Sequence, residues 1–83
     1  MKIRVRLFAS LKEKAGTSVI SLSVPAGTSV EQLLSIIQSE NMELNGATQG
    51  VLVAINQEYA SSDTIIMESD ELALIPPVSG GQT

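Results

Sequence analysis

Apolar and polar residues alternate strictly in the first part of the chain, and this pattern limits the fold more than any other feature of the sequence. Between residues 2 and 8 the core-type apolar side chains are Ile3, Val5 and Leu7, and the same period of two returns between residues 19 and 24. A period of two is typical of β-strands with one buried face. We therefore predict two half-buried strands, and the short connection between them favours antiparallel pairing.

Two sequence patterns predict where helices begin. Ser10 and Glu13 have the spacing of a capping box, which predicts a short helix that ends at Gly16. Thr28 and Glu31 have the same spacing and predict the start of a longer helix. The apolar residues of this longer helix fall on one stripe, which consists of Val30, Leu33, Leu34 and Ile37. The stripe predicts that one side of the helix packs against the sheet.

The rest of the chain contains loops and short strands. We expect a loop from 41 to 50, a buried strand from 51 to 55, a turn and a short edge strand up to residue 59, and a last strand from 72 to 75. This order predicts an α+β fold of the β-grasp (ubiquitin-like roll) class, in which a mixed sheet packs on one main helix plus a short helix. One helix covers only one face of such a sheet, so we expect the opposite face to be uncovered.

The composition argues against a self-sufficient active site. The chain has no histidine and no cysteine, so the usual general base and the thiolate ligands of zinc are missing. The acidic run from 68 to 71 lacks the ligand spacing of a calcium loop. We predict that the chain holds no metal and no cofactor, and that it is not an enzyme by itself.

Charge and hydropathy narrow the classes of partner. The net charge is −4, and all five basic residues lie between Lys2 and Lys14, which argues against nucleic-acid binding. The sequence has no apolar run of the length that spans a membrane, and the absence of cysteine fits a cytoplasmic protein. The acidic remainder of the chain is either a solvated surface or a surface that faces a basic partner.

Three apolar residues are predicted on the uncovered face of the sheet. Phe8 and Tyr59 are the only aromatic residues, and Phe8 is out of phase with the core residues of its strand. Ile75 is likewise out of phase with Leu72 and Leu74 in the last strand. Together the three predict a patch that docks a protein partner, although each taken singly is also an ordinary exposed apolar residue.

The carboxyl end of the chain is the second candidate site. We predict a folded domain over residues 1–75 and a flexible tail over residues 76–83. The part of the tail expected to enter a partner consists of Pro76, Pro77, Val78, Ser79, Gly80 and Gly81. The prolines end the last strand, and glycines, which lack a Cβ, can enter a channel too narrow for other residues. A terminal glycine carboxylate can react with ATP to form an acyl adenylate. The alternative interpretation of Gly80-Gly81 is a flexible end without a function.

These features together resemble the ThiS/MoaD-type family of ubiquitin-like sulfur carriers, to which the small subunit of molybdopterin synthase belongs. The resemblance covers nearly the whole chain. It is carried by three blocks, which are Leu7-Phe8-Ala9 with Leu11-Lys12-Glu13 and Gly16, Ala54-Ile55-Asn56-Gln57-Glu58-Tyr59, and Asp70-Glu71-Leu72-Ala73-Leu74-Ile75-Pro76-Pro77-Val78-Ser79-Gly80-Gly81. Ser69 is a departure, because the family often has glycine before the Asp-Glu pair, but a β-turn accepts serine there.

The resemblance implies a role in molybdenum cofactor biosynthesis. A ubiquitin-activating-type adenylyltransferase would adenylate Gly81 with ATP, and a sulfur donor protein would convert the adenylate to a thiocarboxylate. The tail would then enter the large subunit of molybdopterin synthase, which supplies the catalytic residues, and would give its sulfur to cyclic pyranopterin monophosphate. The resemblance also implies that Phe8, Tyr59 and Ile75 pack against partners, and that two small subunits and a large-subunit dimer form a heterotetramer.

The end of the chain departs from the family pattern, because Gln82 and Thr83 follow Gly81. The α-carboxylate then belongs to Thr83, and Gly81 cannot be adenylated until both residues are removed. Three explanations compete: removal by a peptidase, an addition foreign to the native chain, and loss of carrier activity. We favour removal.

Other functions share many of the same features. Sulfur carriers for thiamine thiazole synthesis or for tRNA thiolation have the same fold and Gly-Gly end, but they usually lack the step Pro76-Pro77. A ubiquitin-like protein modifier would need the same activated Gly81, which it would join to lysines of its targets. An interaction module with an inert tail would need only the docking patch.

Overall fold

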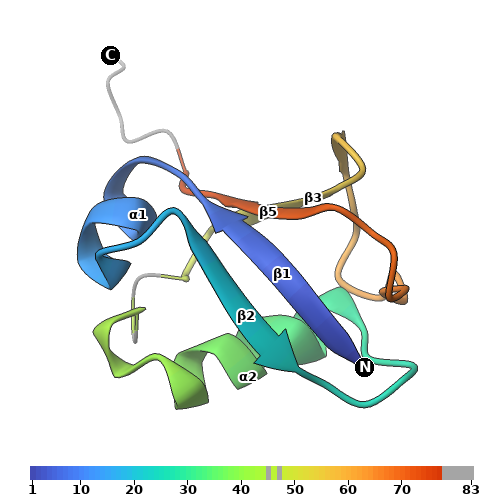
Figure 1. Cartoon of the computed structure of the whole chain (residues 1–83). Coiled ribbons are helices and arrows are strands. Elements are labelled where there is room, and N and C mark those ends of the chain that lie inside the picture. The colour runs from blue at the N-terminus through green and yellow to red at the C-terminus, as the bar shows by residue number, and fades with distance from the viewer. Residues whose placement is uncertain (45, 47, 78–83) are drawn as a thin grey trace.

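The part of the chain that the structure describes forms a sheet of five strands with its main helix on one side. The computed structural model describes residues 1–44, 46 and 48–77. The elements, in chain order, are β1 (Lys2–Leu7), α1 (Ala9–Ala15), β2 (Val19–Ser23), α2 (Val30–Glu40), the 3₁₀-helix η1 (Met42–Leu44), β3 (Leu52–Ile55), β4 (Glu58–Tyr59) and β5 (Leu72–Ile75). The short helix α1 lies at one end of β1, and the amino terminus lies at the other end (Figure 1).

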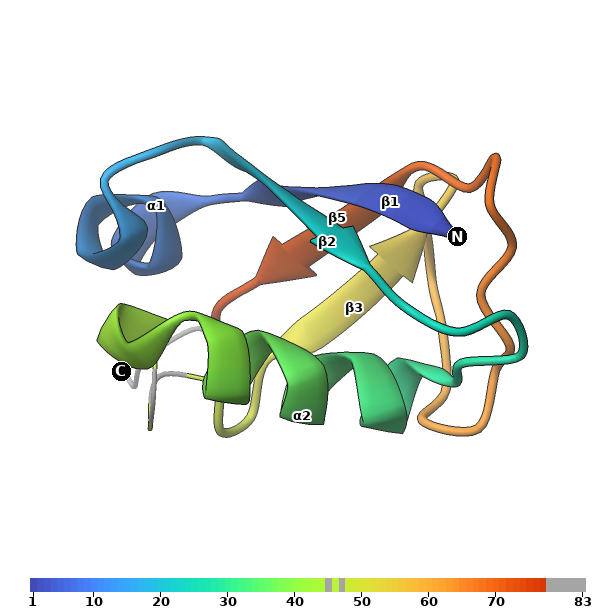
Figure 2. The same ribbon diagram turned by 60° about the horizontal axis from the view of Figure 1, so that its bottom comes forward.

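The strands follow the order β2-β1-β5-β3-β4 across the sheet. β1 pairs antiparallel with β2 and parallel with β5, while β3 pairs antiparallel with both β5 and β4. The first and last strands of the chain therefore lie side by side in the middle of the sheet. α2 crosses one face of this mixed sheet (Figure 2), which confirms the predicted α+β fold and its β-grasp class.

The alternation in the first two strands assigns their faces as predicted. Ile3, Val5 and Leu7 are buried on the side of α2, and Lys2, Arg4 and Arg6 are exposed on the other side. On β2 the buried residues are Ile20 and Leu22, and the strands are antiparallel with Val5 opposite Ile20. The segment between them contains α1, whose end at Gly16 is also as predicted, because this glycine has the left-handed φ of 75°.

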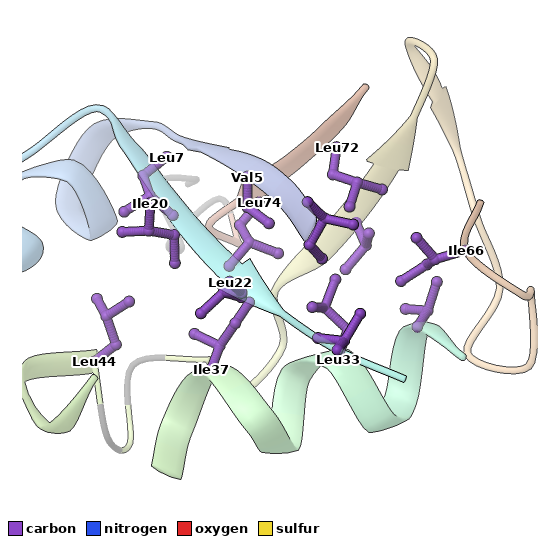
Figure 3. Packing of buried hydrophobic residues seen from close by; sticks show 14 of the residues in the cluster. Val5, Leu7, Ile20, Leu22, Leu33, Ile37, Leu44, Ile66, Leu72 and Leu74 are labelled. Carbon is purple, nitrogen blue, oxygen red and sulfur yellow. The ribbon is translucent and has the colours of Figure 1, made fainter. Parts of the chain in front are cut away.

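The core fills the space between the sheet and α2, as Figure 3 shows. Leu33 and Ile37 of α2 are fully buried against the inward side chains of the strands. Leu34, which was predicted on the same stripe, is only half-buried at the margin of the core. In the described ranges, no helix has both the length and the apolar character needed to cross a lipid bilayer.

The predicted capping box of the main helix is wrong by one residue. Ser29, not Thr28, is the N-cap of α2, and its side chain and that of Gln32 form the reciprocal pair of bonds of a capping box. The reason is tertiary: the carbonyl of Thr28 accepts a hydrogen bond from the amide of Ile66, and Ser29 forms a β-bridge with Ile65. These contacts hold Ser29 in extended backbone, with φ −89° and ψ 168°, so the helix begins only after this residue.

The capping box predicted for the short helix is also wrong. The N-cap of α1 is Phe8, without a side-chain cap, and Ser10 lies inside the helix. β1 continues to Leu7, whose amide donates to the carbonyl of Ser18, and the chain then turns at once. The amide of Leu11 already donates to the carbonyl of Phe8, so the helix starts before Ser10 can cap it.

The second half of the chain differs from the prediction in two details. The segment from 41 to 50, predicted as loop, contains η1, whose Leu44 is fully buried. The strand predicted as buried from 51 to 55 is β3, and its Leu52 is 47% exposed because it lies on the face away from α2. The predicted turn after β3 and the short edge strand β4 are confirmed.

Candidate functional site

A row of four residues crosses the uncovered face of the sheet on neighbouring strands. Arg6 of β1 lies opposite Ala73 of β5, Ala73 lies opposite Ala54 of β3, and Ala54 lies opposite Tyr59 of β4. Side chains at register partners stand on the same face of a sheet. Two alanines in the middle of the row leave space that a larger side chain would fill, and the row therefore forms the floor of a depression with a taller side chain at each end.

The depression is a hollow of about 300 Å³, which we call the docking hollow. Its lining consists of Arg6, Phe8, Ala54, Gln57, Tyr59, Glu71, Ala73 and Ile75. The structure thus brings the three predicted patch residues to one place. Phe8 is 42% exposed and Tyr59 is 70% exposed, whereas Ile75 is half-buried. That these residues bind a partner stays a prediction.

Several residues of this face were missed by the sequence reasoning. Ala54 and Ala73 are small and gave no signal as site residues, although the alternation of β5 did put Ala73 on the same side as Ile75. Leu52 was assigned to a buried strand, but it is exposed directly opposite Ile75. Alternation alone could have indicated Leu52, since it is out of phase with the buried Val53.

The position of Phe8 depends on the sharp turn from β1 into α1. Phe8 is in extended backbone, with φ −127° and ψ 154°, and Ala9 then takes a left-handed φ of 51°. Alanine is strained at such a φ, which glycine adopts freely. The Phe8 ring also contacts Arg6, whose guanidinium carbon lies 5.8 Å from the centre of the ring, within the range of a cation–π contact.

Polar contacts tie the wall of the docking hollow to the turn after β3. The side chain of Asn56 accepts a hydrogen bond from the amide of Glu71 (3.0 Å) and donates one to Oδ1 of Asp70 (3.0 Å). Oδ2 of Asp70 accepts from the amide of Met67 at 2.8 Å. The carboxylate of Glu71 in turn lies 3.3 Å from a guanidinium nitrogen of Arg6. Asn56 therefore holds two acidic residues of the 68–71 run in place, which gives these residues a structural role.

The chain leaves the sheet next to the docking hollow. Ile75, the last residue of β5, lines the hollow, and Pro76 and Pro77 follow it directly. The ring of Pro77 lies beside Gly50, because a Cβ placed on this glycine would be 3.5 Å from Cγ of Pro77. The remaining tail residues of the prediction, Val78, Ser79, Gly80 and Gly81, lie outside the described residues.

Elsewhere on the described residues, no surface combines a depression with the predicted site residues as the docking hollow does. A wider depression of about 560 Å³ lies at the start of α2, between Pro25 and Ile36, and contains none of the predicted site residues. Within residues 1–44, 46 and 48–77, no group of three acidic, histidine or cysteine side chains is arranged to hold a metal ion. The docking hollow and the exit of the tail beside it are therefore the candidate functional site.

Comparison with known proteins tests the predicted resemblance. The model of the ThiS family matches residues 5–81. The molybdopterin synthase sulfur carrier subunit of Arabidopsis thaliana is 35% identical over 98% of this chain and 84% of its own length. The protein of the same name from Chlamydomonas reinhardtii is 34% identical over 98% of this chain and all of its own length.

A solved structure shows the same fold. The small archaeal modifier protein 1 of H. volcanii is 28% identical, with a TM-score of 0.81 over 93% of this chain and 98% of that chain. The names of the two sequence relatives also agree with the prediction that the chain is a carrier subunit and not an enzyme by itself. With a family match over almost its whole length and relatives at this identity, the chain belongs to the ThiS family of ubiquitin-like sulfur carrier proteins.

Proposed function

We propose that this protein is the sulfur carrier subunit of a molybdopterin synthase. In this proposal the carboxylate of Gly81 attacks the α-phosphorus of ATP on a ubiquitin-activating-type adenylyltransferase, and pyrophosphate leaves. A sulfide equivalent from a sulfur donor protein then displaces AMP and leaves a thiocarboxylate. The thiocarboxylate gives its sulfur to cyclic pyranopterin monophosphate in the large subunit of the synthase. The names of the sequence relatives support this branch of the family over carriers for thiamine or tRNA.

One observation carries the proposal: the strand that completes the docking hollow also leads into the tail. Ile75 lines the hollow, and Gly81 follows six positions later in the sequence. A partner seated in the hollow would thus lie within reach of the tail, since six extended residues span at most about 20 Å. The docking hollow would then determine which partner binds, and the partner would supply the catalytic groups.

The proposal requires the removal of Gln82 and Thr83. An amide bond joins Gly81 to Gln82 in this sequence, so the carboxylate that ATP must meet does not yet exist. The match to the family model ends at Gly81, which supports Gly81 as the working end. We propose that a peptidase cleaves after Gly81, and that Pro76 to Gly80 then form the segment that enters each partner in turn.

A reconstitution with two forms of the chain tests this proposal. The chain ending at Gly81 and the chain ending at Thr83 are each incubated with the adenylyltransferase, ATP, the sulfur donor, the large subunit and cyclic pyranopterin monophosphate. We expect pyrophosphate release, a mass change from carboxylate to thiocarboxylate, and molybdopterin formation only with the chain ending at Gly81. Equal inactivity of both forms, with the partners active on their own carrier, would contradict the proposal.

A second function is favoured by the structural relative, whose name describes a protein modifier. A modifier would join the activated Gly81 to lysine side chains of other proteins by an isopeptide bond. Mass spectrometry of peptides from the native cells distinguishes the two functions, with a protease that cleaves after glutamate, because this chain has no basic residue after Lys14 at which trypsin could cut. Lysines bearing the remnant 72–81 of this chain, without any thiocarboxylate form, would favour the modifier.

A further inference from the structure

The uncovered face carries a row of positive charge beside the docking hollow. Lys2, Arg4 and Arg6, which we call the cationic row, alternate along β1 and are all exposed on this face. Their register partners on β2 are Ser23, Ser21 and Val19. None of these partners carries a charge, so β2 does not neutralise the row. This arrangement is unexpected in a chain whose net charge is −4.

Two carboxylates lie close to the cationic row, and each already has a partner within the chain. Arg4 and Arg6 line a second hollow of about 320 Å³, which also contains Asp70 and Glu71. Glu71 pairs with Arg6, and Asp70 accepts hydrogen bonds from Asn56 and from the amide of Met67. Among the described residues, the ion pair of Arg6 is the only one that the cationic row forms.

The cationic row and the docking hollow form one continuous surface. Arg6 belongs to both, because it ends the row and lines the hollow. Arg4 is two residues back on the same face, a distance of about 7 Å along a strand. A protein surface that fills the hollow must therefore cover Arg6 and reach the neighbourhood of Arg4. Arg6 keeps its partner Glu71, but Arg4 forms no ion pair among the described residues. Covering such a cation without giving it a partner costs free energy, so the charge of the row selects among partners.

We infer that the partner which occupies the docking hollow presents carboxylate side chains to the cationic row. This inference rests on the proposed function, in which that partner is the large subunit of the synthase. Its physical basis is charge complementarity at short range. At physiological ionic strength, charges more than about 8 Å apart are largely screened, so a seated partner responds to the row more than to the net charge of the chain.

The position of three of the nine acidic residues supports the same conclusion. Glu31 and Glu40 lie on α2, and Glu43 lies on η1. Because α2 covers the opposite face of the sheet (Figure 2), these carboxylates face away from the docking hollow. The sequence suggested an acidic surface facing a basic partner, but on the uncovered face the structure favours the reverse sign.

A matched pair of charge reversals tests the inference. Arg4→Glu changes the cationic row without touching the lining of the docking hollow, and Lys14→Glu makes the same change of net charge on α1. The rate of association with the isolated large subunit is measured at several salt concentrations. We expect Arg4→Glu to lower the association rate at least about tenfold at low salt and to flatten its salt dependence. Lys14→Glu should change the rate less than about threefold. Circular dichroism confirms that both variants fold, and Arg4→Gln serves as a milder variant.

The outcomes separate this inference from the proposed function. Equal losses in Arg4→Glu and Lys14→Glu would overturn the inference alone, because net charge would then suffice. Failure of the unchanged chain to bind the large subunit would overturn the proposed function and the inference with it. Self-association of the chain that Arg4→Glu abolishes, seen by analytical ultracentrifugation, would also overturn the inference, since the occupant would be a second copy.

Zero-length cross-linking gives a direct readout of the partner's chemistry. A carbodiimide joins an amine to a carboxylate only where the two are in contact. In the complex with the large subunit we expect cross-links from Lys2, and from position 4 in the Arg4→Lys variant, to aspartate or glutamate of the large subunit. Lys12 and Lys14 of α1 are the internal controls. Cross-links from these two residues alone would overturn the inference.

Discussion

Phe8 follows β1 directly and lines the docking hollow, and 42% of its surface is exposed. We expect Phe8→Ala to weaken binding to the large subunit at least about tenfold, or about 1.4 kcal/mol, as for a central aromatic residue of an interface. The free energy of unfolding should change by less than about 1 kcal/mol, since the ring is not part of the core. Calorimetric titration and thermal unfolding measure the two effects.

Met42→Ala is the matched control for Phe8→Ala. Met42 is 71% exposed on η1 and does not line the docking hollow. Its replacement should leave binding unchanged within about twofold. If Met42→Ala and Phe8→Ala weakened binding equally, the docking hollow would not be the contact surface.

Asn56 and Gln57 form a turn in which both residues have a positive φ, 53° and 72°. Asn56 also carries the two hydrogen bonds that hold Glu71 and Asp70, and losing them should cost about 1–3 kcal/mol of unfolding free energy in Asn56→Gly. Asn56→Ala should cost more, because alanine is strained at this φ. Gln57→Gly removes strain without removing such bonds and should stabilise by up to about 1 kcal/mol.

Urea unfolding of the three variants checks this order of stabilities. Unchanged stability of Asn56→Gly would show that the two side-chain hydrogen bonds contribute nothing. In that case the wall of the docking hollow would be held by the pairing of β5 with β1 and β3 and by the bond from the backbone amide of residue 56 to the carbonyl of Glu71.

At the scale of the elements, the stability of α2 depends on the hydrogen bonds of its first turn. The capping box of Ser29 and Gln32 satisfies amides that the helix itself leaves without partners. Ser29→Ala should therefore lower the free energy of unfolding by about 1 kcal/mol. Ser35→Ala, at an exposed position inside the same helix, should be neutral or slightly stabilising because alanine is the better helix former. If Ser35→Ala lowered the free energy of unfolding as much as Ser29→Ala, the capping box would not be what stabilises the start of α2.

For the whole molecule, stability depends on how well α2 packs against the buried face of the sheet. A chain of 83 residues has little core to lose. Leu33 is fully buried, whereas Leu34, the next residue, is only half-buried. Leu33→Ala should cost about 2–5 kcal/mol of unfolding free energy, and Leu34→Ala should cost less than half as much. Denaturant unfolding compares the two variants, and equal costs would contradict the different burial of Leu33 and Leu34.

At the same scale, the sheet order explains why the candidate site is assembled from distant parts of the sequence. Arg6 and Ala73 become neighbours only because β1 and β5 pair in parallel at the centre of the sheet. Tyr59 joins them through the edge strand β4. One face of the molecule is thus used for stability, through α2, and the other is left available for a partner.

The sequence by itself determined which side of β1, β2 and β5 is buried, where the turn after β3 falls, and that Phe8 and Ile75 point away from the core. It could do so because alternation and turn chemistry are local, and each residue's face follows from its neighbours. It also predicted the helix stripe of α2, apart from the half-buried Leu34.

Only the tertiary structure decided the register of the strands, and with it the alanine floor of the docking hollow and the placement of the cationic row beside that hollow. The same holds for the helix starts, where the bridge between Ser29 and Ile65 overrode the capping pattern of Thr28. Pairings between residues far apart in the chain depend on the packing of the whole molecule, and a single sequence carries no local signal for them.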